Sequence, residues 1–243
     1  MKKISFALLV MSVFTFFGCG DFSLPEAVKD FFIPGAVKKV RLPDIERMQR
    51  EADESAKRYR KQLESAERVR INYEQLGRRY ADQGSWTPAI ECFTTAIGYG
   101  SAGADIHYML GASYANRARE TNNKEDMNMA ESHYSKAISK NPELVSAQYG
   151  LGLLVFFLKK DHARGIEIMR ELSFRRPDFF EARFALGRFY YENGEIARAL
   201  STYESLYSAL QDRKDSSITR EMRDNCKANI TRIMSELQIQ RSK

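Results

Sequence analysis

The sequence predicts an all-α fold, a solenoid of antiparallel helix pairs, on two observations. In the stretch from Phe180 to Leu210, apolar residues recur at helical spacing on both sides of the dipeptide Asn193-Gly194. The same internal spacings return three times upstream, and a repeat of fixed period determines the architecture of a chain. With 243 residues, the chain is long enough for one elongated stack in which each pair buries its apolar face against its neighbours.

The last hairpin shows why these residues form a helix pair. Its turn, Asn193-Gly194, supplies the left-handed residue that ends a helix. Gly187 and Ala199 stand where the two helices would cross, and their small side chains let the backbones approach. Tyr190 and Tyr203 would fill the space alongside. The apolar positions are Phe184, Leu186, Phe189 and Tyr190 before the turn, and Ile196, Leu200, Tyr203 and Leu206 after it.

Three upstream copies share these spacings. The second copy contains seven extra residues, and the third is displaced by one residue midway. The first copy has Tyr73, Leu76-Gly77, Tyr80, Ala89, Phe93 and Ala96; the second has His107, Leu110-Gly111, Tyr114, Ala130, Tyr134 and Ala137; the third has Leu151-Gly152, Val155, Gly165, Met169 and Leu172.

The paired leucine and glycine, the aromatic residue three positions later and the small-aromatic-small series that follows resemble the tetratricopeptide repeat. Four copies cover residues 70–211. Ser101 and Gln211 stand where the family usually has proline. The resemblance implies a right-handed superhelix of helix pairs, with a concave groove that binds other proteins or peptides.

The amino-terminal residues have the layout of a secretory leader. Lys2 and Lys3 are followed by an uncharged apolar run that is short for a membrane-spanning helix. Gly18 followed by Cys19 resembles the end of a bacterial lipoprotein signal, although Phe16 and Phe17 depart from the usual residues. The resemblance implies that residues 1–18 are removed and that Cys19 carries the lipid. An uncleaved anchor and an ordinary leader are the alternatives.

Two further segments precede the repeats. Residues 19–43 contain three prolines and are expected to form a tether; a short helix from Pro25 to Ile33 that contacts the lipid surface or the solenoid is the alternative. Residues 44–69 form a long, charged helix with a narrow apolar stripe. This helix is expected to cap the first repeat, since terminal repeats need a polar outer face; pairing with a helix of a partner is the alternative. Residues 216–240 are expected to form the helix that caps the last repeat.

The extra residues of the second repeat fall between Arg117 and Met129, with the break at Thr121-Asn122-Asn123. We expect each helix to be one turn longer; a lip that contacts a partner is the alternative. In the third repeat, the helix from Ser146 to Leu158 is apolar almost all round, which is typical of a buried helix.

By the resemblance, the first helix of each pair lines the groove. We expect an apolar or aromatic peptide segment to bind there, with Arg78 and Arg188 available to acidic groups. The alternative is that several of the aromatic side chains pack between repeats and the groove binds nothing. The expected lining is Glu74, Arg78, Tyr108, Ala112, Asn116, Tyr149, Leu153, Phe156, Phe184, Arg188 and Tyr191.

The residues do not suggest an enzyme, a metal site or a cofactor. No phosphate-binding loop or nucleophile elbow occurs. The histidines, His107, His133 and His162, are isolated in the sequence, and Cys92 and Cys226 are expected to be buried free thiols. Outside the leader, basic residues exceed the interspersed acidic ones by only four, which argues against nucleic-acid binding.

Two functions fit these features. The first is a membrane-anchored scaffold lipoprotein of the bacterial cell envelope, facing the periplasm, whose repeats bind a protein partner during assembly of a complex. The second is an accessory protein that holds a small hydrophobic ligand for transport. A closed, dry pocket around Tyr149, Phe156 and Phe184 would favour the second function, and an open groove would favour the first.

Overall fold

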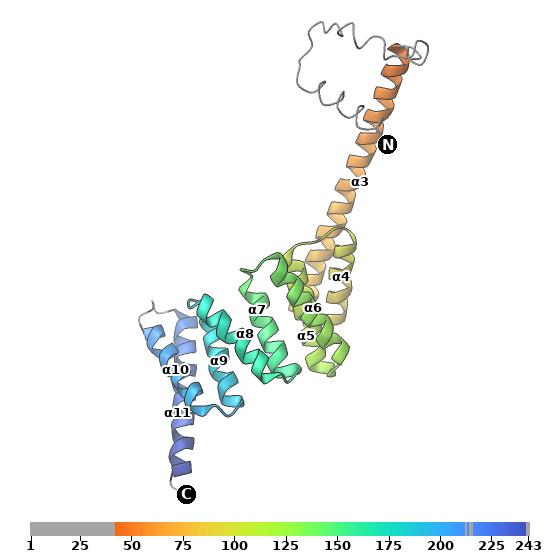
Figure 1. Ribbon diagram of the computed structural model, residues 1–243. Coiled ribbons are helices and arrows are strands. Elements are labelled where there is room, and N and C mark those ends of the chain that lie inside the picture. Colours follow the sequence, from red (N-terminus) through yellow and green to blue (C-terminus); the bar gives the residue numbers. More distant parts are fainter. Residues whose placement is uncertain (1–41, 212, 214–215, 242–243) are drawn as a thin grey trace, which may run out of the picture. The chain divides into compact units, whose positions relative to one another are not determined.

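The computed structural model describes residues 42–211, 213 and 216–241 (Figure 1). It divides into two compact units, Met1–Arg58 and Tyr59–Lys243. The described part of the first unit is the beginning of helix α3 (Leu42–Asp82); the second unit holds the rest of that helix and the helices that follow. The leader and the predicted lipidation site at Cys19 lie outside the described residues.

Every secondary-structure element of the described residues is helical, which confirms the prediction of an all-α fold. Across this part of the chain, no helix combines the length and the apolar character needed to span a membrane. The helices after α3 are α4 (Trp86–Gly98), α5 (Ala104–Thr121), α6 (Lys124–Lys140), α7 (Val145–Leu153), the π turn η1 (Leu154–Leu158), α8 (His162–Arg175), α9 (Phe180–Glu192), α10 (Ile196–Gln211) and α11 (Ser217–Arg241).

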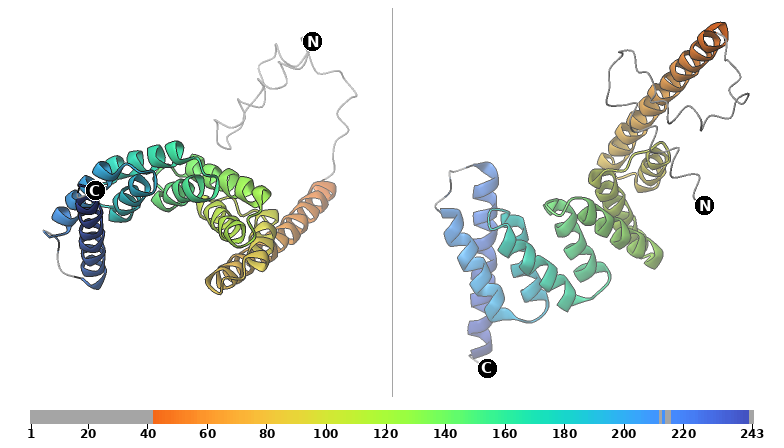
Figure 2. Two further views of the ribbon diagram at one scale, coloured as in Figure 1. Left: turned by 90° about the horizontal axis from the view of Figure 1, so that it is seen from below. Right: turned by 45° about the horizontal axis from the view of Figure 1, so that its top comes forward.

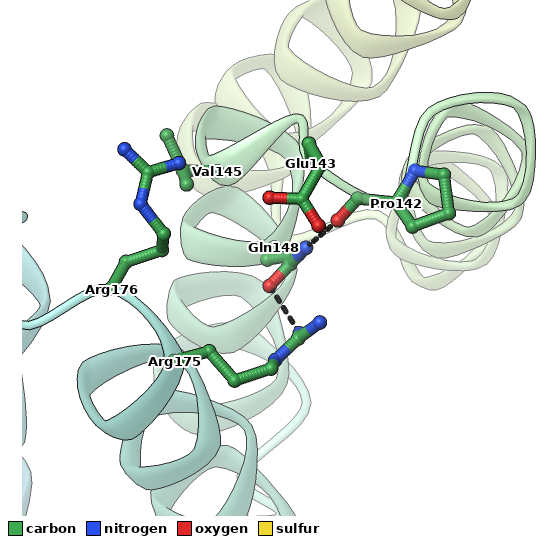
Figure 3. Close-up of a pocket in the computed structure, with 6 residues that line it drawn as sticks. All are labelled: Pro142, Glu143, Val145, Gln148, Arg175 and Arg176. Carbon is green, nitrogen blue, oxygen red and sulfur yellow. Dashed lines mark hydrogen bonds between the residues drawn. The ribbon is translucent and has the colours of Figure 1, made fainter.

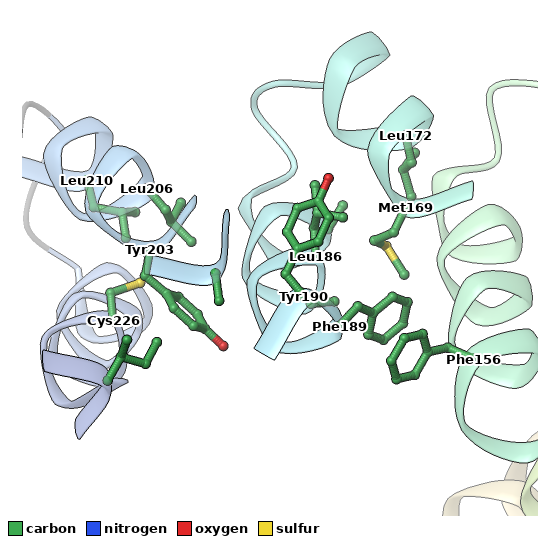
Figure 4. Close-up of a cluster of buried hydrophobic side chains, with 14 residues drawn as sticks. Phe156, Met169, Leu172, Leu186, Phe189, Tyr190, Tyr203, Leu206, Leu210 and Cys226 are labelled. Atoms are coloured by element: carbon green, nitrogen blue, oxygen red, sulfur yellow. The ribbon is translucent and has the colours of Figure 1, made fainter. Parts of the chain in front are cut away.

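Within the second unit, each helix from α4 to α11 packs on the next one in chain order, so that antiparallel pairs stack side by side (Figure 2). The pairs are α3 with α4, α5 with α6, α7 and η1 with α8, and α9 with α10. One buried cluster joins η1, α8, α9, α10 and α11 (Figure 4). In it, Cys226 and Ile233 of α11 are fully buried.

Close contact at glycine holds each pair together. A Cβ atom added at Gly187 would lie 2.9 Å from the Tyr203 ring, a distance that real Cβ atoms do not adopt. The crossing predicted at Gly187 is therefore confirmed, with Tyr203 packed directly over the glycine. The other pairs repeat this contact: Gly77 with Phe93, Gly111 with Tyr134, and Gly152 with Met169.

The turn predicted at Asn193-Gly194 is also confirmed. Gly194 has a φ of 79°, in the left-handed region that glycine adopts without steric cost. Its amide donates to the Tyr191 carbonyl at 3.0 Å, and the Glu195 amide donates to the Tyr190 carbonyl at 2.8 Å. These bonds satisfy carbonyls at the end of α9.

The one-residue displacement in the third repeat corresponds to the π turn η1. The Lys159 amide donates to the Leu154 carbonyl, five residues back, at 3.0 Å. A π turn accommodates one extra residue within a helix. Lys160 then takes a φ of 60°, and α8 begins two residues later.

The expectation that each helix of the second pair is one turn longer is confirmed for its first helix and only in part for its second. Helix α5 has 18 residues against 13 in α9, whereas α6 has 17 against 13 in α4, 14 in α8 and 16 in α10. The break comes at Asn122, with a φ of 54°, and Asn123, whose side chain accepts hydrogen bonds from the Glu125 and Asp126 amides. Arg117 joins the two helices through a bidentate pair with Asp126, at 2.7 and 2.8 Å.

The separate capping helix expected over residues 44–69 is not present. Residues 42–82 form one continuous helix, α3, that includes the first helix of the first repeat. The chain has no reason to stop at residue 70, because neither proline nor glycine occurs from Asp44 to Leu76. Tyr59 and Leu63, two residues of the narrow apolar stripe by which residues 44–69 were expected to cap the first repeat, are 64% and 52% exposed.

Candidate functional site

Part of the expected groove lining comes together at one cavity. A cavity of about 180 Å³ opens between α5 and the third pair. Asn116 and Leu153, both expected there, line it, and Gly150 leaves it room on the α7 side. The remaining lining residues are Ala115, Arg119, Tyr134, Leu154, Phe157 and Leu158.

Phe156 was expected in the groove, and this expectation is wrong. Its side chain is 2% exposed and stacks on Phe189, with ring centroids 3.9 Å apart (Figure 4). Its neighbour Phe157 lines the cavity instead. The cause is η1: regular α-helical spacing after Tyr149 and Leu153 leads to Phe156, and the extra residue of the π turn puts Phe157 in that place.

Two polar groups in this cavity were not foreseen. Arg119 is the charged residue of its lining, and it makes no ion pair within the described part of the chain. Tyr134 reaches across from α6 to Gly150: a Cβ added at Gly150 would lie 2.8 Å from the Tyr134 hydroxyl. Burial raises the pKa of Tyr134 and the charge of Tyr108 adds to this rise, so the phenol is neutral at physiological pH.

The Tyr134 hydroxyl is free to bind a ligand group. The side chain is only 4% exposed, and no hydrogen-bond partner for its oxygen is found among the described residues. A neutral phenol donates one hydrogen bond and accepts others. The sequence signal for this group is Gly150, whose missing side chain admits the tyrosine of the preceding repeat.

On α9, Arg188 connects the groove to the third pair. Its guanidinium carbon lies 4.5 Å from the centroid of the Phe157 ring, a cation–π geometry. It also pairs with Glu192 at 3.5 Å and stays exposed. Arg188 therefore covers one side of Phe157 and still presents its charge to solvent.

The remaining expected lining residues are dispersed. Tyr149 packs edge-on against Phe179 at 5.6 Å, and Phe184 against Tyr203 at 5.4 Å. Tyr108 lies 6.2 Å from Tyr134. Of the others, Arg78 is exposed on α3, Ala112 is half-buried on α5 and Glu74 pairs with Arg70 at 2.7 Å.

Helix α11 covers the carboxyl-terminal end of the groove. The Tyr191 hydroxyl donates to the Glu236 carboxylate at 2.9 Å, and Arg232 lies over the Tyr191 ring at 4.6 Å. This hydrogen bond is the first cause of a raised pKa for Tyr191. Nearer the start of α11, a cavity of about 210 Å³ is lined by Phe184, Ile218, Glu221, Met222 and Asn225. The Tyr191 side chain is thus held by contacts with α11 of the same chain.

A second cavity, of about 250 Å³, lies where the α6–α7 loop meets the end of α8 (Figure 3). Its centre is Gln148, 6% exposed, whose side chain donates to the Pro142 carbonyl and accepts from Arg175 at 2.7 Å. Arg176 is engaged with Asp178 at 3.2 Å. Through these two hydrogen bonds, Gln148 of α7 ties the α6–α7 loop to the end of α8.

His107 and His133, isolated in the sequence, meet between α5 and α6. Their Nδ1 atoms are 3.2 Å apart, so one ring must donate and the other accept. Burial, with the charges of Lys136 and His107, lowers the pKa of His133 to about 4. Within the described residues, no group of three or more His, Cys, Asp or Glu side chains could hold a metal ion. Cys92 and Cys226 are buried free thiols, as expected.

Comparisons with known proteins agree with this architecture. Residues 159–214, which span α8, α9 and α10, match the tetratricopeptide repeat. No curated protein sequence matches the chain.

Several solved structures share the arrangement of helices. One is a thermophilic TPR protein of Thermus thermophilus, with 21% identity, 73% of this chain and 93% of that chain covered, and a TM-score of 0.55. Another is a MamA protein, with 21% identity, 71% and 93% coverage and a TM-score of 0.52. A tetratricopeptide repeat protein from Parabacteroides merdae ATCC 43184 has 13% identity, 72% and 68% coverage and a TM-score of 0.51. At these identities the likeness concerns the fold, and the described helices of this chain form an all-α tetratricopeptide-repeat solenoid.

Proposed function

We propose that this protein is a membrane-anchored scaffold lipoprotein, whose groove binds a protein partner during assembly of a bacterial cell-envelope complex. The observation that supports it best is the open cavity between α5 and the third pair, which combines apolar walls with two unengaged polar groups. Tetratricopeptide-repeat solenoids generally bind proteins and have no catalytic activity of their own.

The cavity suits a segment of polypeptide. Leu153, Phe157 and Leu158 offer apolar surface for a side chain of the partner. The Tyr134 hydroxyl can donate to a carbonyl or carboxylate oxygen, and Arg119 can pair with an acidic group. We therefore propose an extended segment with an apolar anchor residue beside a hydrogen-bond acceptor.

The transport function is less well supported. Its premise was a closed pocket around Tyr149, Phe156 and Phe184. These three rings pack instead against Phe179, Phe189 and Tyr203, respectively. None of the cavities described above is lined by more than one of these three rings.

In-cell photocrosslinking tests the groove. A photoreactive residue at Leu153 should attach one discrete protein, identified by mass spectrometry. The matched control is Phe174, which is 86% exposed on α8, the second helix of the same pair, and should not attach that protein. Arg119→Glu should abolish the Leu153 crosslink. A chain that crosslinks to no protein but purifies with a bound small molecule would replace the scaffold function with the transport function.

The anchor rests on the sequence. Two lysines, a short apolar run and Gly18-Cys19 are the elements of a lipoprotein signal. A single acyl chain binds a membrane only marginally, whereas several hold a protein stably. Cys19→Ser should therefore move the protein from the membrane to the soluble fraction and abolish labelling with radioactive palmitate. Unchanged labelling would refute lipidation at this residue and would leave the groove experiment unaffected.

A further inference from the structure

Helix α11 occupies the place that the first helix of a further pair would take. It follows α10 and packs on it, as α9 packs on α8 and α7 packs on α6. Cys226 and Ile233 are fully buried in the cluster that α11 shares with α10 (Figure 4). Another side of α11 contacts Tyr191 of α9 through Glu236 and Arg232. Since the first helix of each pair is the one expected to line the groove, α11 lies where a further lining helix belongs.

The cavity near the start of α11 is a recess with apolar walls. Phe184 of α9 and Met222 of α11 are partly buried and pack against the core cluster of the last pairs. Ile218, one helical turn before Met222, also lines the recess and is 68% exposed. A helix that only capped the stack would present polar residues here. The exposed isoleucine therefore indicates a surface that contacts another molecule.

Helix α9 connects this recess to the cavity between α5 and the third pair. Phe184 and Arg188 are four residues apart on α9, so their side chains lie on the same face of the helix. Phe184 lines the recess at α11. Arg188 lies over the ring of Phe157, which lines the other cavity, at 4.5 Å from its centroid. A segment of polypeptide that occupies both cavities crosses this face of α9.

The two cavities carry opposite charges. Arg119 is the charged residue that lines the cavity at α5, and Glu221 is the charged residue that lines the recess at α11. Neither side chain forms an ion pair within the described part of the chain. Arg188, between the cavities, is already paired with Glu192 at 3.5 Å. The groove is thus positive at one end and negative at the other, and such an arrangement favours one direction of a charged ligand over the reverse.

We propose that the partner segment places one apolar side chain in each cavity, with an acidic group beside Arg119 and a basic residue beside Glu221. The inference rests on the proposed function, and it specifies both the chemistry of the partner and the direction in which the segment lies. In recognition of extended peptides, pockets for individual side chains supply the specificity. Helix α11 is then part of the binding surface as well as the cap of the last pair.

In-cell photocrosslinking at two positions tests this proposal. A photoreactive residue at Ile218 should attach the same protein as one at Leu153, and mass spectrometry should place both attachment points in one continuous segment of that protein. The residue attached at Leu153 should lie beside Asp or Glu, and the residue attached at Ile218 beside Lys or Arg. The matched control is Met234, which is 48% exposed on α11 but about 160° from Ile218 around the helix axis, and it should not attach this protein.

Charge reversal tests the role of Glu221. The probe is a synthetic peptide of the crosslinked segment, titrated into the purified full chain in a Cys19→Ser background that removes the lipid. Glu221→Arg should raise the dissociation constant at least about fivefold, because an attraction becomes a repulsion. Glu204→Arg makes the same change of charge at an exposed position of α10, the second helix of the last pair, and should leave the dissociation constant unchanged.

The outcomes separate this inference from the proposed function. Capture at Leu153 without capture at Ile218 would overturn the inference and leave the groove as a binding site. Attachment points with the charges in the reverse order, or equal dissociation constants for the two charge variants, would also overturn it. A chain that captures no protein at Leu153 would refute the proposed function and this inference together.

Discussion

The phenyl rings of Phe156 and Phe189 stack face to face, with centroids 3.9 Å apart and planes 8° apart. Phe157, the next residue, contacts Arg188 and lines the groove. Two adjacent phenylalanines thus have different surroundings: Phe156 lies inside the core that joins the third and fourth pairs, and Phe157 lines the cavity between α5 and the third pair. The π turn η1 determines which of the two rings is buried and which lines the cavity.

Substitution of each phenylalanine by alanine should distinguish these surroundings. Phe156→Ala removes a buried ring and should lower the free energy of unfolding by about 3–5 kcal/mol. Phe157→Ala should cost clearly less stability and should instead weaken crosslinking from Leu153. Urea unfolding followed by circular dichroism measures the first effect. Equal losses of stability for the two variants would show that Phe157 is a core residue.

The histidine pair should make stability depend on pH. Burial lowers the pKa of His133 to about 4 and lowers the pKa of His107 as well, with Lys136 adding to both effects. The unfolded chain, with a histidine pKa of about 6.5, binds more protons than the folded chain between these values. The free energy of unfolding should therefore be highest above pH 6.5 and fall as the pH is lowered towards 4, by at most about 3 kcal/mol for His133.

His133→Phe keeps the ring stacked on Tyr114 but cannot titrate. In urea unfolding between pH 7.5 and 4.5, this variant should lose less stability than the wild type. Parallel curves for the two proteins would assign the pH dependence to other groups.

The close approach at Gly187 predicts a steric effect. Gly187→Leu would place its Cβ about where the Tyr203 ring lies, so the fourth pair must open, at a cost of about 1–3 kcal/mol or more. Gly98, at the end of α4, has no atom within 4 Å of an added Cβ. Gly98→Ala should leave the melting temperature unchanged or raise it. A Gly187→Leu melting curve identical to that of the wild type would place the helix crossing elsewhere.

The break between α5 and α6 depends on two asparagines with different tasks. Asn123→Ala removes the acceptor for two backbone amides and should cost about 0.5–2 kcal/mol. Asn122→Gly is the control, because Asn122 has a φ of 54° and glycine adopts this conformation readily. Chemical unfolding should therefore show a loss for the first variant and little or none for the second. A larger loss for Asn122→Gly would contradict the capping role of Asn123.

The sequence by itself determined the helix pairs and their crossings. These features depend only on residues within one hairpin: the periodic apolar residues, the turn at Asn193-Gly194 and the small residue at Gly187. Their effect on the structure can therefore be predicted from their spacing in the sequence. The groove lining was only partly predictable: Asn116 and Leu153 lie at the cavity, whereas Tyr134 comes from a second helix and Arg119 gave no signal of its own.

Only the tertiary structure decided features that depend on distant partners or on a change of helical register. Phe157 lines the cavity in place of Phe156, because the extra residue of the π turn rotates the side chains that follow it around the helix axis. His107 and His133, 26 residues apart, meet because α5 and α6 are antiparallel. Leu76 has the same local sequence pattern as Leu110, yet one is exposed and the other buried. Burial depends on whether another helix covers the residue, and spacing along one helix carries no information about that neighbour.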